Sequence, residues 1–578
     1  MMKKYPNLRI NLFLGIILLS SSLILYRLFV LSVVRHSAYS LTAKAQKENI
    51  NNILARGNIY LSDQGQNLFL AATNKKFPLA HIVPRDIEAE ARDKAIDLVA
   101  EILGLNSLDV KSQIDFQSKS LKVLARRITN EQVDRIKNLK LKGVGVSYEA
   151  DRFYPGSNLA SNVIGFLGYD YDGKRAGQYG VEGYYDRELS GRNQNLSGLL
   201  NSKGPMAIFK KINGTGSGSS SSQEFDRPSD LVLTIDKNAQ TFIEKQLEDI
   251  TKKWQAEAGT IIVQEPESGR IIAMADWPNF NPNSYAATEP KLFLNSGIQE
   301  IYEPGSSFKP VTMATGLDLL KITPQTSYED NGFVNIAGYT IHNFSDRVFG
   351  IQTMTQVLEN SVNTGIMFVE NLVGDDNFLN YVINMGFGQK TGIDLPGEVS
   401  GDVNNLYSGR KINYLTSSFG QGIAVTPMQL INAYSVIANG GRLMRPYIVE
   451  RIIKEGGEEV KVQPEVVGIP ISEKTAVKLQ SMLVSVVDNG FDKARIKGYD
   501  VAGKTGTAQV PDGSGGYSEK EFIHNFVGFA PAYNAKFVVL IKMDKPKGIQ
   551  FAADSLSPVF KEITAFLLNY YNIPPTRK

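Results

Sequence analysis

The sequence predicts a chain of mixed α/β (α+β) class: one transmembrane helix, then a mixed α+β pedestal domain, then a larger domain of helices and antiparallel sheet. Three observations predict this order. The chain has 578 residues, too many for one compact domain. A long apolar run lies close to the amino terminus. After residue 228, a strand, a helix and a hairpin follow one another, a succession typical of an antiparallel sheet with helices packed against it.

The apolar run, residues 10–34, has the length needed to cross a bilayer, which takes about 20 residues. The tail before it, residues 1–9, carries three basic side chains, so the positive-inside rule places that tail in the cytoplasm. Residues 43–45 (AKA) loosely match a signal-peptidase site, but they lie well beyond the run. The pattern therefore favours an uncleaved, single-pass anchor in the cell membrane, with everything after about residue 35 outside the cytoplasm.

A pedestal without catalytic motifs is expected over residues 35–227. Helical patterns occupy residues 88–103 and 130–139. Residues 213–222 (NGTGSGSSSS) have the composition of a flexible connector, either a loop or a linker. Because regular strand and helix patterns begin soon after this segment, we place the domain boundary between residues 227 and 228.

The larger domain is expected to cover residues 228–572, with a short tail at 573–578. Its first segments are a strand at 231–235 and a helix at 237–254. Two strands at 260–264 and 270–275 flank the turn residues PESG and are expected to form a hairpin.

Composition excludes several classes of function. Lys and Arg number 62 and Asp and Glu 59, so the net charge of +3 gives no basis for a nucleic-acid partner. The absence of cysteine excludes disulfides, thiolate catalysis and Cys-based metal sites. The four histidines, His36, His81, His342 and His524, lack the spacing of metal ligands. We therefore expect neither a metal nor a cofactor.

The strongest chemical signal lies in residues 303–310 (EPGSSFKP). A Pro-Gly turn precedes apolar residues that continue as a helix, and residues three apart on a helix share a face. The side chains of Ser306 and Lys309 can therefore converge. A serine hydroxyl needs a base to take its proton, and a buried lysine with a lowered pKa can serve as that base. Alone, an S-x-x-K match is most often accidental.

Two further motifs change that assessment. Ser361 and Asn363 form S-x-N, and residues 504–507 read KTGT. S-x-x-K, S-x-N and K-T-G, in that order, are the motif set of penicillin-binding proteins and class A β-lactamases. Residues 390–392 also read KTG, but a turn-rich segment follows them. We select Lys504, because strand-like segments suited to pair with its strand follow at 526–530 and 536–543.

On these motifs, residues 228–572 resemble a penicillin-binding transpeptidase domain of serine transpeptidase/β-lactamase-like fold. The whole chain resembles the class B, monofunctional penicillin-binding proteins, peptidoglycan D,D-transpeptidases of division or elongation type. The resemblance also rests on shorter blocks: RGNIY at 56–60, RFYPG at 152–156, GVEG at 180–183, GIDLPGE at 392–398 and GQG at 420–422. The sequence departs from the family at Leu61-Ser62, where Asp-Arg is usual, which concerns the pedestal and not the catalytic motifs.

The resemblance implies a role for each catalytic residue. Lys309 would take the proton of Ser306, which attacks the carbonyl of the penultimate D-alanine in a stem peptide. Ser361 would relay the proton towards the departing amine. The Asn363 amide would hydrogen-bond both the base and the substrate backbone. Lys504 would place a second positive charge nearby, which helps to keep one proton-accepting group neutral.

The same resemblance implies which groups hold the substrate. The backbone N–H groups of Ser306 and Thr507 would form the oxyanion hole. Lys504, Thr505 and Thr507 would bind the terminal carboxylate of the D-Ala-D-Ala unit. Gly506 has no side chain, so the substrate backbone could lie along its strand.

The implied ligands are peptidoglycan stem peptides ending in D-Ala-D-Ala, and β-lactams. Residues 35–230 lack the acidic motif of a glycosyltransferase domain, so the implied partners are a polytopic membrane glycosyltransferase and other divisome or elongasome proteins. Two kinds of alternative remain open. Water could resolve the acyl-enzyme, as in a D,D-carboxypeptidase or a β-lactamase, or the chain could be a catalytically silent penicillin-binding sensor or scaffold. Septal and elongation roles are not separated by the sequence, although overall length favours the division type slightly.

Overall fold

The computed structural model describes residues 18, 21–22, 56–191, 227–336, 338–490, 492–511 and 516–577. The predicted anchor, apart from three of its residues, and the predicted connector at 213–222 lie outside the described residues. Among the residues that are described, no helix combines the length and the apolar character that crossing a bilayer requires. The anchor at 10–34 therefore stays a prediction.

The described chain forms two compact units, and unit 2 is built from two separate stretches of sequence. Unit 1 contains Asn74–Asp151, and unit 2 contains Gly57–Thr73 together with Arg152–Lys578. The boundary that we placed between residues 227 and 228 coincides with neither limit of these units. The reason is a strand pairing across that point: β7 (Asp230–Asp236) runs parallel to β1 (Ile59–Ser62) in one sheet.

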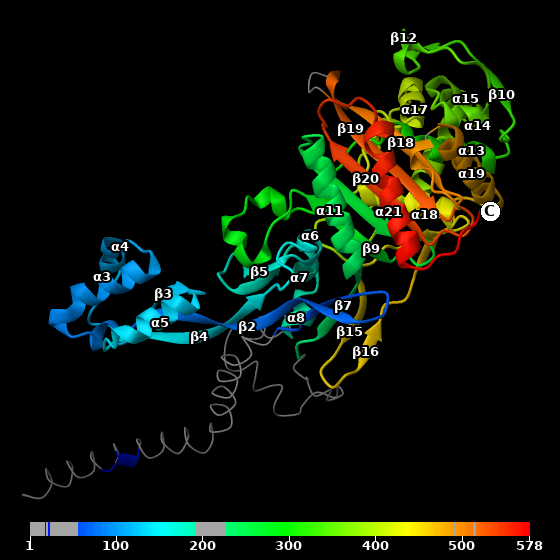
Figure 1. Cartoon of the computed structure of the whole chain (residues 1–578). Coiled ribbons are helices and arrows are strands. Elements are labelled where there is room, and N and C mark those ends of the chain that lie inside the picture. The colour runs from blue at the N-terminus through cyan, green and yellow to red at the C-terminus, as the bar shows by residue number, and fades with distance from the viewer. Residues whose placement is uncertain are drawn as a thin grey trace, which may run out of the picture. The chain divides into compact units, whose positions relative to one another are not determined.

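Unit 1 is a small α/β unit. Its helices are α3 (Arg92–Leu103), α4 (Ser107–Ser112) and α5 (Asn130–Leu139), and its strands are β3 (Lys122–Arg126) and parts of β2 (Leu68–Ile82) and β4 (Val144–Phe153) (Figure 1). The helices predicted at 88–103 and 130–139 are confirmed as α3 and α5. A capping box between Thr129 and Gln132 begins α5, and Gly104 in a left-handed conformation ends α3.

Unit 2 contains the predicted strand at 231–235 as β7. Residues 231–236 of this strand are buried, so both of its faces are covered, and it lies inside a sheet between β1 and the antiparallel β15 (Val449–Ile453). The edge strand β16 (Glu459–Lys461) pairs with β15. Short elements precede β7: α6 (Ser161–Ile164), β5 (Phe166–Tyr169), β6 (Arg175–Gln178), α7 (Gly180–Tyr184) and α8 (Asp186–Ser190).

A buried ion pair joins three of the sequence blocks that lie before β7. Nε of Arg152 donates to the Glu182 carboxylate at 2.6 Å, and both side chains are at most 1% exposed. The same guanidinium donates to the Gly57 carbonyl at 2.8 Å, and the Tyr154 hydroxyl donates to Glu182 at 3.2 Å. The Gly57 carbonyl of RGNIY and side chains from RFYPG and GVEG therefore meet at one buried charge pair within unit 2.

Replacing Glu182 by alanine is expected to lower the free energy of unfolding by about 3–5 kcal/mol, because Arg152 would remain as an uncompensated buried charge. The exposed pair Lys245–Asp249, one helical turn apart on α11 (Lys237–Lys253), offers a matched control. Asp249→Ala should cost no more than about 0.5 kcal/mol. Urea unfolding of both variants measures the difference, and equal losses would show that the buried pair is not a structural requirement.

The five-stranded sheet of unit 2 is antiparallel throughout. Its order is β18 (Ala502–Pro511), β19 (Tyr517–Ala530), β20 (Phe537–Asp544), β8 (Ala258–Gln264) and β9 (Ile271–Trp277). The hairpin predicted around residues 266–269 is confirmed as β8 and β9, and the strand predicted around Lys504 is confirmed as β18. β18 lies at the edge of the sheet, so one row of its backbone groups has no strand partner there.

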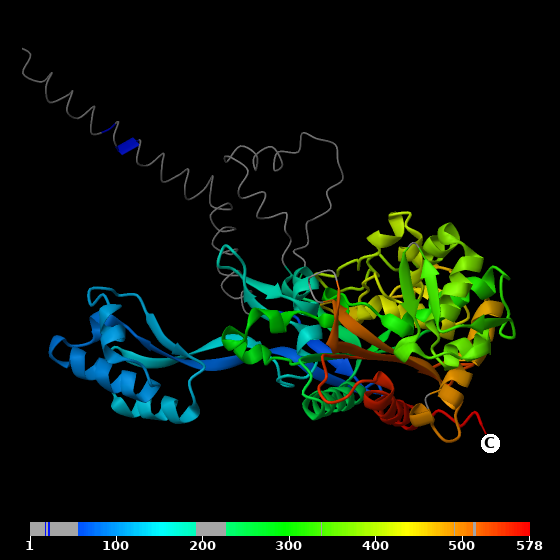
Figure 2. The ribbon, with the colours of Figure 1, turned by 90° about the horizontal axis from the view of Figure 1, so that it is seen from above.

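Helices cover both faces of this sheet. α11, which confirms the helix predicted at 237–254, lies with α21 (Ser557–Tyr570) on one face, and the helices between residues 309 and 438 lie on the other (Figure 2). Alternating strand residues explain this layering. Ile261 packs with α11 and α21, whereas Ile262 belongs to the core on the opposite face.

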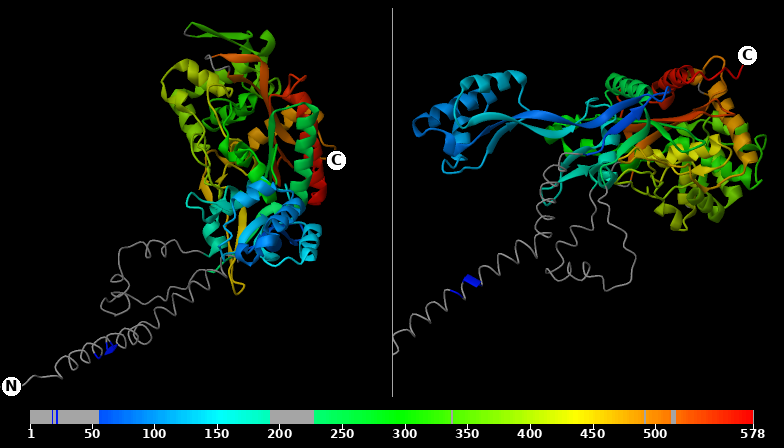
Figure 3. Two further views of the ribbon diagram at one scale, coloured as in Figure 1. Left: turned by 90° about the vertical axis from the view of Figure 1, so that its left-hand side faces the viewer. Right: turned by 90° about the horizontal axis from the view of Figure 1, so that it is seen from below.

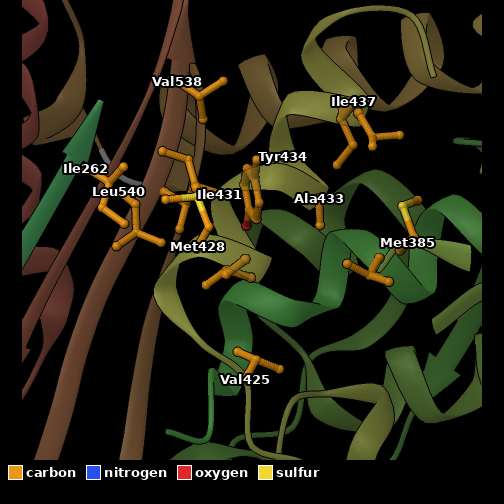
Figure 4. Close-up of a cluster of buried hydrophobic side chains, with 14 of the residues drawn as sticks. Ile262, Met385, Val425, Met428, Ile431, Ala433, Tyr434, Ile437, Val538 and Leu540 are labelled. Carbon is orange, nitrogen blue, oxygen red and sulfur yellow. The ribbon is translucent and has the colours of Figure 1, made fainter. Parts of the chain in front are cut away.

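Helix α18 (Pro427–Ala438) is buried along its whole length and forms the centre of that second core. Figure 4 shows Met428, Ile431 and Tyr434 of this helix facing Ile262, Val538 and Leu540 of the sheet. The three buried polar side chains of α18, Gln429, Asn432 and Ser435, all form hydrogen bonds, as buried polar groups generally do. The Tyr434 hydroxyl donates to the Ser307 carbonyl at 2.8 Å, which ties this core helix to the turn of the predicted nucleophile.

The remaining elements of unit 2 include a peripheral hairpin, β11 (Phe333–Ile336) with β12 (Tyr339–His342), seen at the top of the left view in Figure 3. β10 (Ser327–Asp330) pairs with β13 (Gly350–Thr353). The other elements are α12 (Ser296–Gln299), α13 (Lys309–Asp318), α14 (Met354–Glu359), α15 (Asn363–Val373), α16 (Asp375–Asn384), α17 (Lys411–Ser418), β14 (Leu443–Met444), β17 (Val466–Gly468), α19 (Glu473–Ser485) and α20 (Ala552–Ser555). The prediction of a mixed α/β fold with an antiparallel sheet is therefore confirmed.

Candidate active site

Ser306 lies in a tight helical turn, Gly305–Phe308, that leads directly into α13. The left-handed Gly305 (φ 57°) donates its N–H to the Gly420 carbonyl at 3.0 Å. A Cβ atom at Gly420 would come within 2.2 Å of the Gly305 carbonyl oxygen, so only glycine fits there. The GQG block thus supports the turn of the predicted nucleophile.

Ser306 is half-buried, and within the described part of the chain its hydroxyl forms no hydrogen bond. Its neighbour differs. Ser307 is fully buried, and its hydroxyl donates to the Pro304 carbonyl at 2.8 Å. Of the two adjacent serines, Ser306 is therefore the one whose hydroxyl is available to a substrate.

The three sequence motifs meet at Ser361. Nζ of Lys309 lies 2.5 Å from the Ser361 carbonyl oxygen and 3.1 Å from its Oγ. Nζ of Lys504 lies 3.0 Å from the same Oγ and 3.2 Å from the Thr505 carbonyl oxygen. Both lysines are 0% exposed. S-x-x-K, S-x-N and K-T-G, which are far apart in sequence, thus share one hydroxyl group.

Burial decides the charge state of these lysines. Burial, together with the neighbouring Lys504 cation, holds the pKa of Lys309 well below that of an ordinary lysine. Burial also lowers the pKa of Lys504 to about 7. Two ammonium groups at one hydroxyl repel each other, so the arrangement favours a neutral amine beside a cation. A hydroxyl between them can accept from the ammonium and donate to the amine.

The backbone explains how Ser361 reaches both lysines. Ser361 follows the end of α14 and has φ 55°, a left-handed value that costs a non-glycine residue about 1–2 kcal/mol. Backbone hydrogen bonds hold this conformation: Ser361 N–H donates to Leu358 at 3.2 Å, and Val362 N–H donates to Val357 at 2.9 Å. The turn presents the carbonyl and the hydroxyl of Ser361 on the same side, towards Lys309.

Asn363 is half-buried at the start of α15 and occupies a different position from the one its expected role suggests. Its amide donates to the His342 carbonyl at 3.3 Å, and in the described part of the chain it makes no hydrogen bond to Lys309. A buried network lies beneath it. The Asn343 amide donates to both oxygens of Asp330 at 3.0 and 2.9 Å, and the Thr364 hydroxyl donates to Asp330 at 2.7 Å.

Sequence reasoning missed this network. Asp330, Asn343 and Thr364 are separated by 13 to 34 residues and belong to no motif, so no spacing marks them. All three are buried, and the carboxylate also accepts the backbone N–H groups of Gly332 and Phe349 at 3.0 and 2.8 Å. The network fixes the loop that carries His342 against the start of α15.

The third motif lies on β18, next to the turn of Ser306. A Cβ atom at Gly506 would come within 2.5 Å of the Pro304 carbonyl oxygen and 2.6 Å of the Asn525 amide oxygen. Glycine is therefore needed for β18 to approach the nucleophile turn. This packing role differs from the open space for a substrate backbone that the sequence suggested.

Thr505 and Thr507 differ in exposure. Thr505 is buried, whereas Thr507 is half-buried and accepts the Ala552 N–H at 3.1 Å through its hydroxyl oxygen. The second KTG stretch, residues 390–392, lies on no strand. Lys390 is exposed, and the Glu398 carboxylate accepts the Thr391 N–H at 2.7 Å and the Gly392 N–H at 3.0 Å, which closes a loop.

A metal site was not expected from the sequence. Within the described ranges, His, Asp and Glu side chains form no group of three or more that is able to hold a metal ion.

Comparison with known proteins gives the family. Residues 259–565 match the model of the penicillin-binding protein transpeptidase domain, and residues 54–207 match the penicillin-binding protein dimerisation domain. Stage V sporulation protein D of Bacillus subtilis is 33% identical over 518 residues, which cover 88% of this chain and 77% of that protein. Peptidoglycan D,D-transpeptidase FtsI of Escherichia coli (strain K12) is 30% identical over 459 residues, 78% of this chain and 73% of that protein.

Solved structures agree on the fold. Penicillin-binding protein 3 of Mycobacterium tuberculosis, in complex with aztreonam, superposes with a TM-score of 0.67 at 23% identity, covering 90% of this chain and 97% of that one. A peptidoglycan synthetase of Bifidobacterium adolescentis superposes with a TM-score of 0.66 at 25% identity, covering 91% and 97%. With one family model matching more than half of the residues and relatives aligned over more than two thirds of their length, the chain belongs to the class B penicillin-binding proteins.

Proposed function

We propose that this protein cross-links peptidoglycan as a serine D,D-transpeptidase, with Ser306 as the nucleophile. One observation carries the proposal: the Ser361 hydroxyl lies between two buried lysines, with Nζ of Lys309 at 3.1 Å and Nζ of Lys504 at 3.0 Å. This is an arrangement for moving a proton, and Ser306 lies in the turn directly before Lys309, where its hydroxyl makes no hydrogen bond within the described chain.

The acylation step follows from these positions. Neutral Lys309 takes the proton of Ser306, and Oγ of Ser306 forms a bond to the carbonyl carbon of the penultimate D-alanine. The oxyanion of the tetrahedral intermediate accepts hydrogen bonds from the backbone N–H groups of Ser306 and Thr507. The proton passes from Lys309 through Ser361 to the nitrogen of the leaving D-alanine, and the C–N bond breaks.

Substrate binding uses the third motif. Lys504, Thr505 and Thr507 bind the terminal carboxylate of the stem peptide. A β-lactam carries a carboxylate in a comparable place and acylates Ser306 in the same way. The edge of β18 that pairs with no strand in the described sheet supports the backbone of the donor peptide, and Asn363 exchanges its bond to His342 for one to the substrate.

The acyl-enzyme is resolved by the amine of a second stem peptide, which forms the cross-link and frees Ser306. With paired stem peptides, we expect cross-linked dimers and released D-alanine in equal amounts. Mass spectrometry of the products, with a parallel D-alanine assay, measures the ratio. Released D-alanine without dimers would identify a carboxypeptidase instead, and neither product would identify a silent penicillin-binding scaffold.

We further propose that residues 10–34 anchor the protein in the cell membrane, with residues 1–9 in the cytoplasm and the catalytic domain outside. The support is the basic tail before an apolar run in which Arg27 is the one charged residue. The anchor also offers the docking element for a polytopic glycosyltransferase and other divisome or elongasome proteins. Replacing residues 8–34 by an unrelated spanning helix tests this docking, because unchanged co-purification of the glycosyltransferase would exclude it.

A further inference from the structure

His524 lies on β19, the strand that pairs with the substrate-binding strand β18, and it belongs to none of the three motifs. It is opposite Thr507 in the antiparallel register of β18 and β19, so the two side chains share one face of the sheet. It is 0% exposed. Buried imidazoles are normally held by partners, and the partners of His524 lie on one short turn.

That turn comprises residues 550–555. Nε2 of His524 lies 3.2 Å from the Gln550 carbonyl oxygen, and Nδ1 lies 2.8 Å from Oγ of Ser555. A carbonyl only accepts, so Nε2 carries the ring proton. Nδ1 of the neutral ring is then an acceptor, and Ser555 donates to it. Burial lowers the pKa of His524 to about 4, in keeping with a neutral ring.

Between these two attachment points, the turn contacts the substrate-binding strand. The N–H of Ala552 donates to Oγ1 of Thr507 at 3.1 Å. This bond uses one lone pair of the hydroxyl and leaves the hydroxyl proton free to be donated. A carboxylate accepts only, so a free hydroxyl proton is what its binding requires. The position of residue 552 therefore sets the direction in which Thr507 donates.

We propose that His524 is a positioning residue for carboxylate recognition. It fixes both ends of the 550–555 turn, the turn places the Ala552 N–H, and this N–H orients the Thr507 hydroxyl towards the carboxylate of the substrate. His524 itself touches no reacting atom. The inference rests on the carboxylate-binding role proposed above for Thr507.

The test compares two acylating agents that differ only in the carboxylate: benzylpenicillin and its methyl ester. The measured quantity is the ratio of their acylation rate constants with the full-length protein. His524→Leu removes both ring bonds and is expected to lower this ratio about fivefold to tenfold, the size of one lost hydrogen bond, by slowing the free acid and not the ester. His524→Gln, which keeps a donor and an acceptor, should restore most of the ratio.

Two further variants keep the inference falsifiable where His524→Leu folds poorly. Ser555→Ala removes the bond at Nδ1 from the other side and should lower the ratio in the same direction. His81→Leu is the matched control, because His81 also pairs with a serine, Ser147 at 3.3 Å, but lies in unit 1. It should leave the ratio unchanged.

The outcomes separate two failures. If the wild-type protein does not prefer the free acid, the carboxylate role of Thr507 fails, and the inference fails with it. If the wild-type preference persists in both His524→Leu and Ser555→Ala, the inference alone is overturned. Equal slowing of acid and ester would assign His524 a purely structural role and would also overturn it.

Discussion

Replacing Ser306 by alanine is expected to abolish covalent labelling of the protein by a fluorescent penicillin. The acylation rate should fall by at least about 10³-fold, because the hydroxyl proposed to form the acyl bond is gone. The structure gives the physical reason. Ser306 is half-buried, and its hydroxyl forms no hydrogen bond within the described chain. It lies one helical turn before the buried Lys309. Labelling is read on a denaturing gel, which retains only covalent adducts.

Ser307→Ala is the matched control for this experiment. It removes the adjacent hydroxyl, which already donates a hydrogen bond to the Pro304 carbonyl at 2.8 Å. Labelling should persist in that variant, slowed by no more than about tenfold through the loss of one buried hydrogen bond. Labelling that survives Ser306→Ala and disappears in Ser307→Ala would show that the nucleophile was assigned to the wrong serine.

The sequence predicts the elements of this fold better than their grouping. Helix and strand patterns locate α5, α11, β8 and β9 because local periodicity reflects burial on one face. The two compact units are harder to find, since a unit boundary depends on pairing between distant residues. β1 and β7 are parallel neighbours although about 170 residues separate them, and no local pattern records that contact.

In the candidate site, too, the sequence predicts some residues and misses others. The meeting of Lys309, Ser361 and Lys504 could be predicted, because S-x-x-K, S-x-N and K-T-G combine chemistry with order along the chain. Their supports could not. Asp330 and Asn343 hold the loop beneath Asn363 through buried hydrogen bonds, and His524 contacts a turn 26 to 31 residues further on. Such residues act through packing, which leaves no fixed spacing in the sequence.

The second large effect concerns the base. Lys309→Met is expected to slow acylation by a benzylpenicillin probe by about 10²- to 10⁴-fold, the range that proton transfer contributes in general-base catalysis. Methionine keeps the length of the side chain and its packing but cannot take a proton. As a matched control, Lys390→Met changes the lysine of the other KTG stretch, which is exposed on a loop, and should leave the rate unchanged.

The pH dependence should report the charge of Lys309. Acylation by the wild type is expected to rise with pH as the amine loses its proton, and to level off well below the pH at which an ordinary lysine titrates, near 10.4. Burial and the Lys504 cation produce this shift. In Lys504→Met the neighbouring charge is gone, so the pKa of Lys309 rises and the limb of the profile moves to higher pH. A limb that stays in place would show that Lys504 does not tune the base.

The free energy of unfolding shows whether the buried lysines have a catalytic or a structural role. A lysine whose pKa is lowered on folding binds more protons in the unfolded chain, so the free energy of unfolding increases with pH between the lowered pKa and about 10.4. At neutral pH the two buried lysines therefore lower stability. Lys309→Met should slow acylation by about 10²- to 10⁴-fold while leaving the free energy of unfolding unchanged or increased, and its stability should depend less on pH. A lysine retained for structure would give the reverse: a destabilised protein whose remaining folded fraction still reacts.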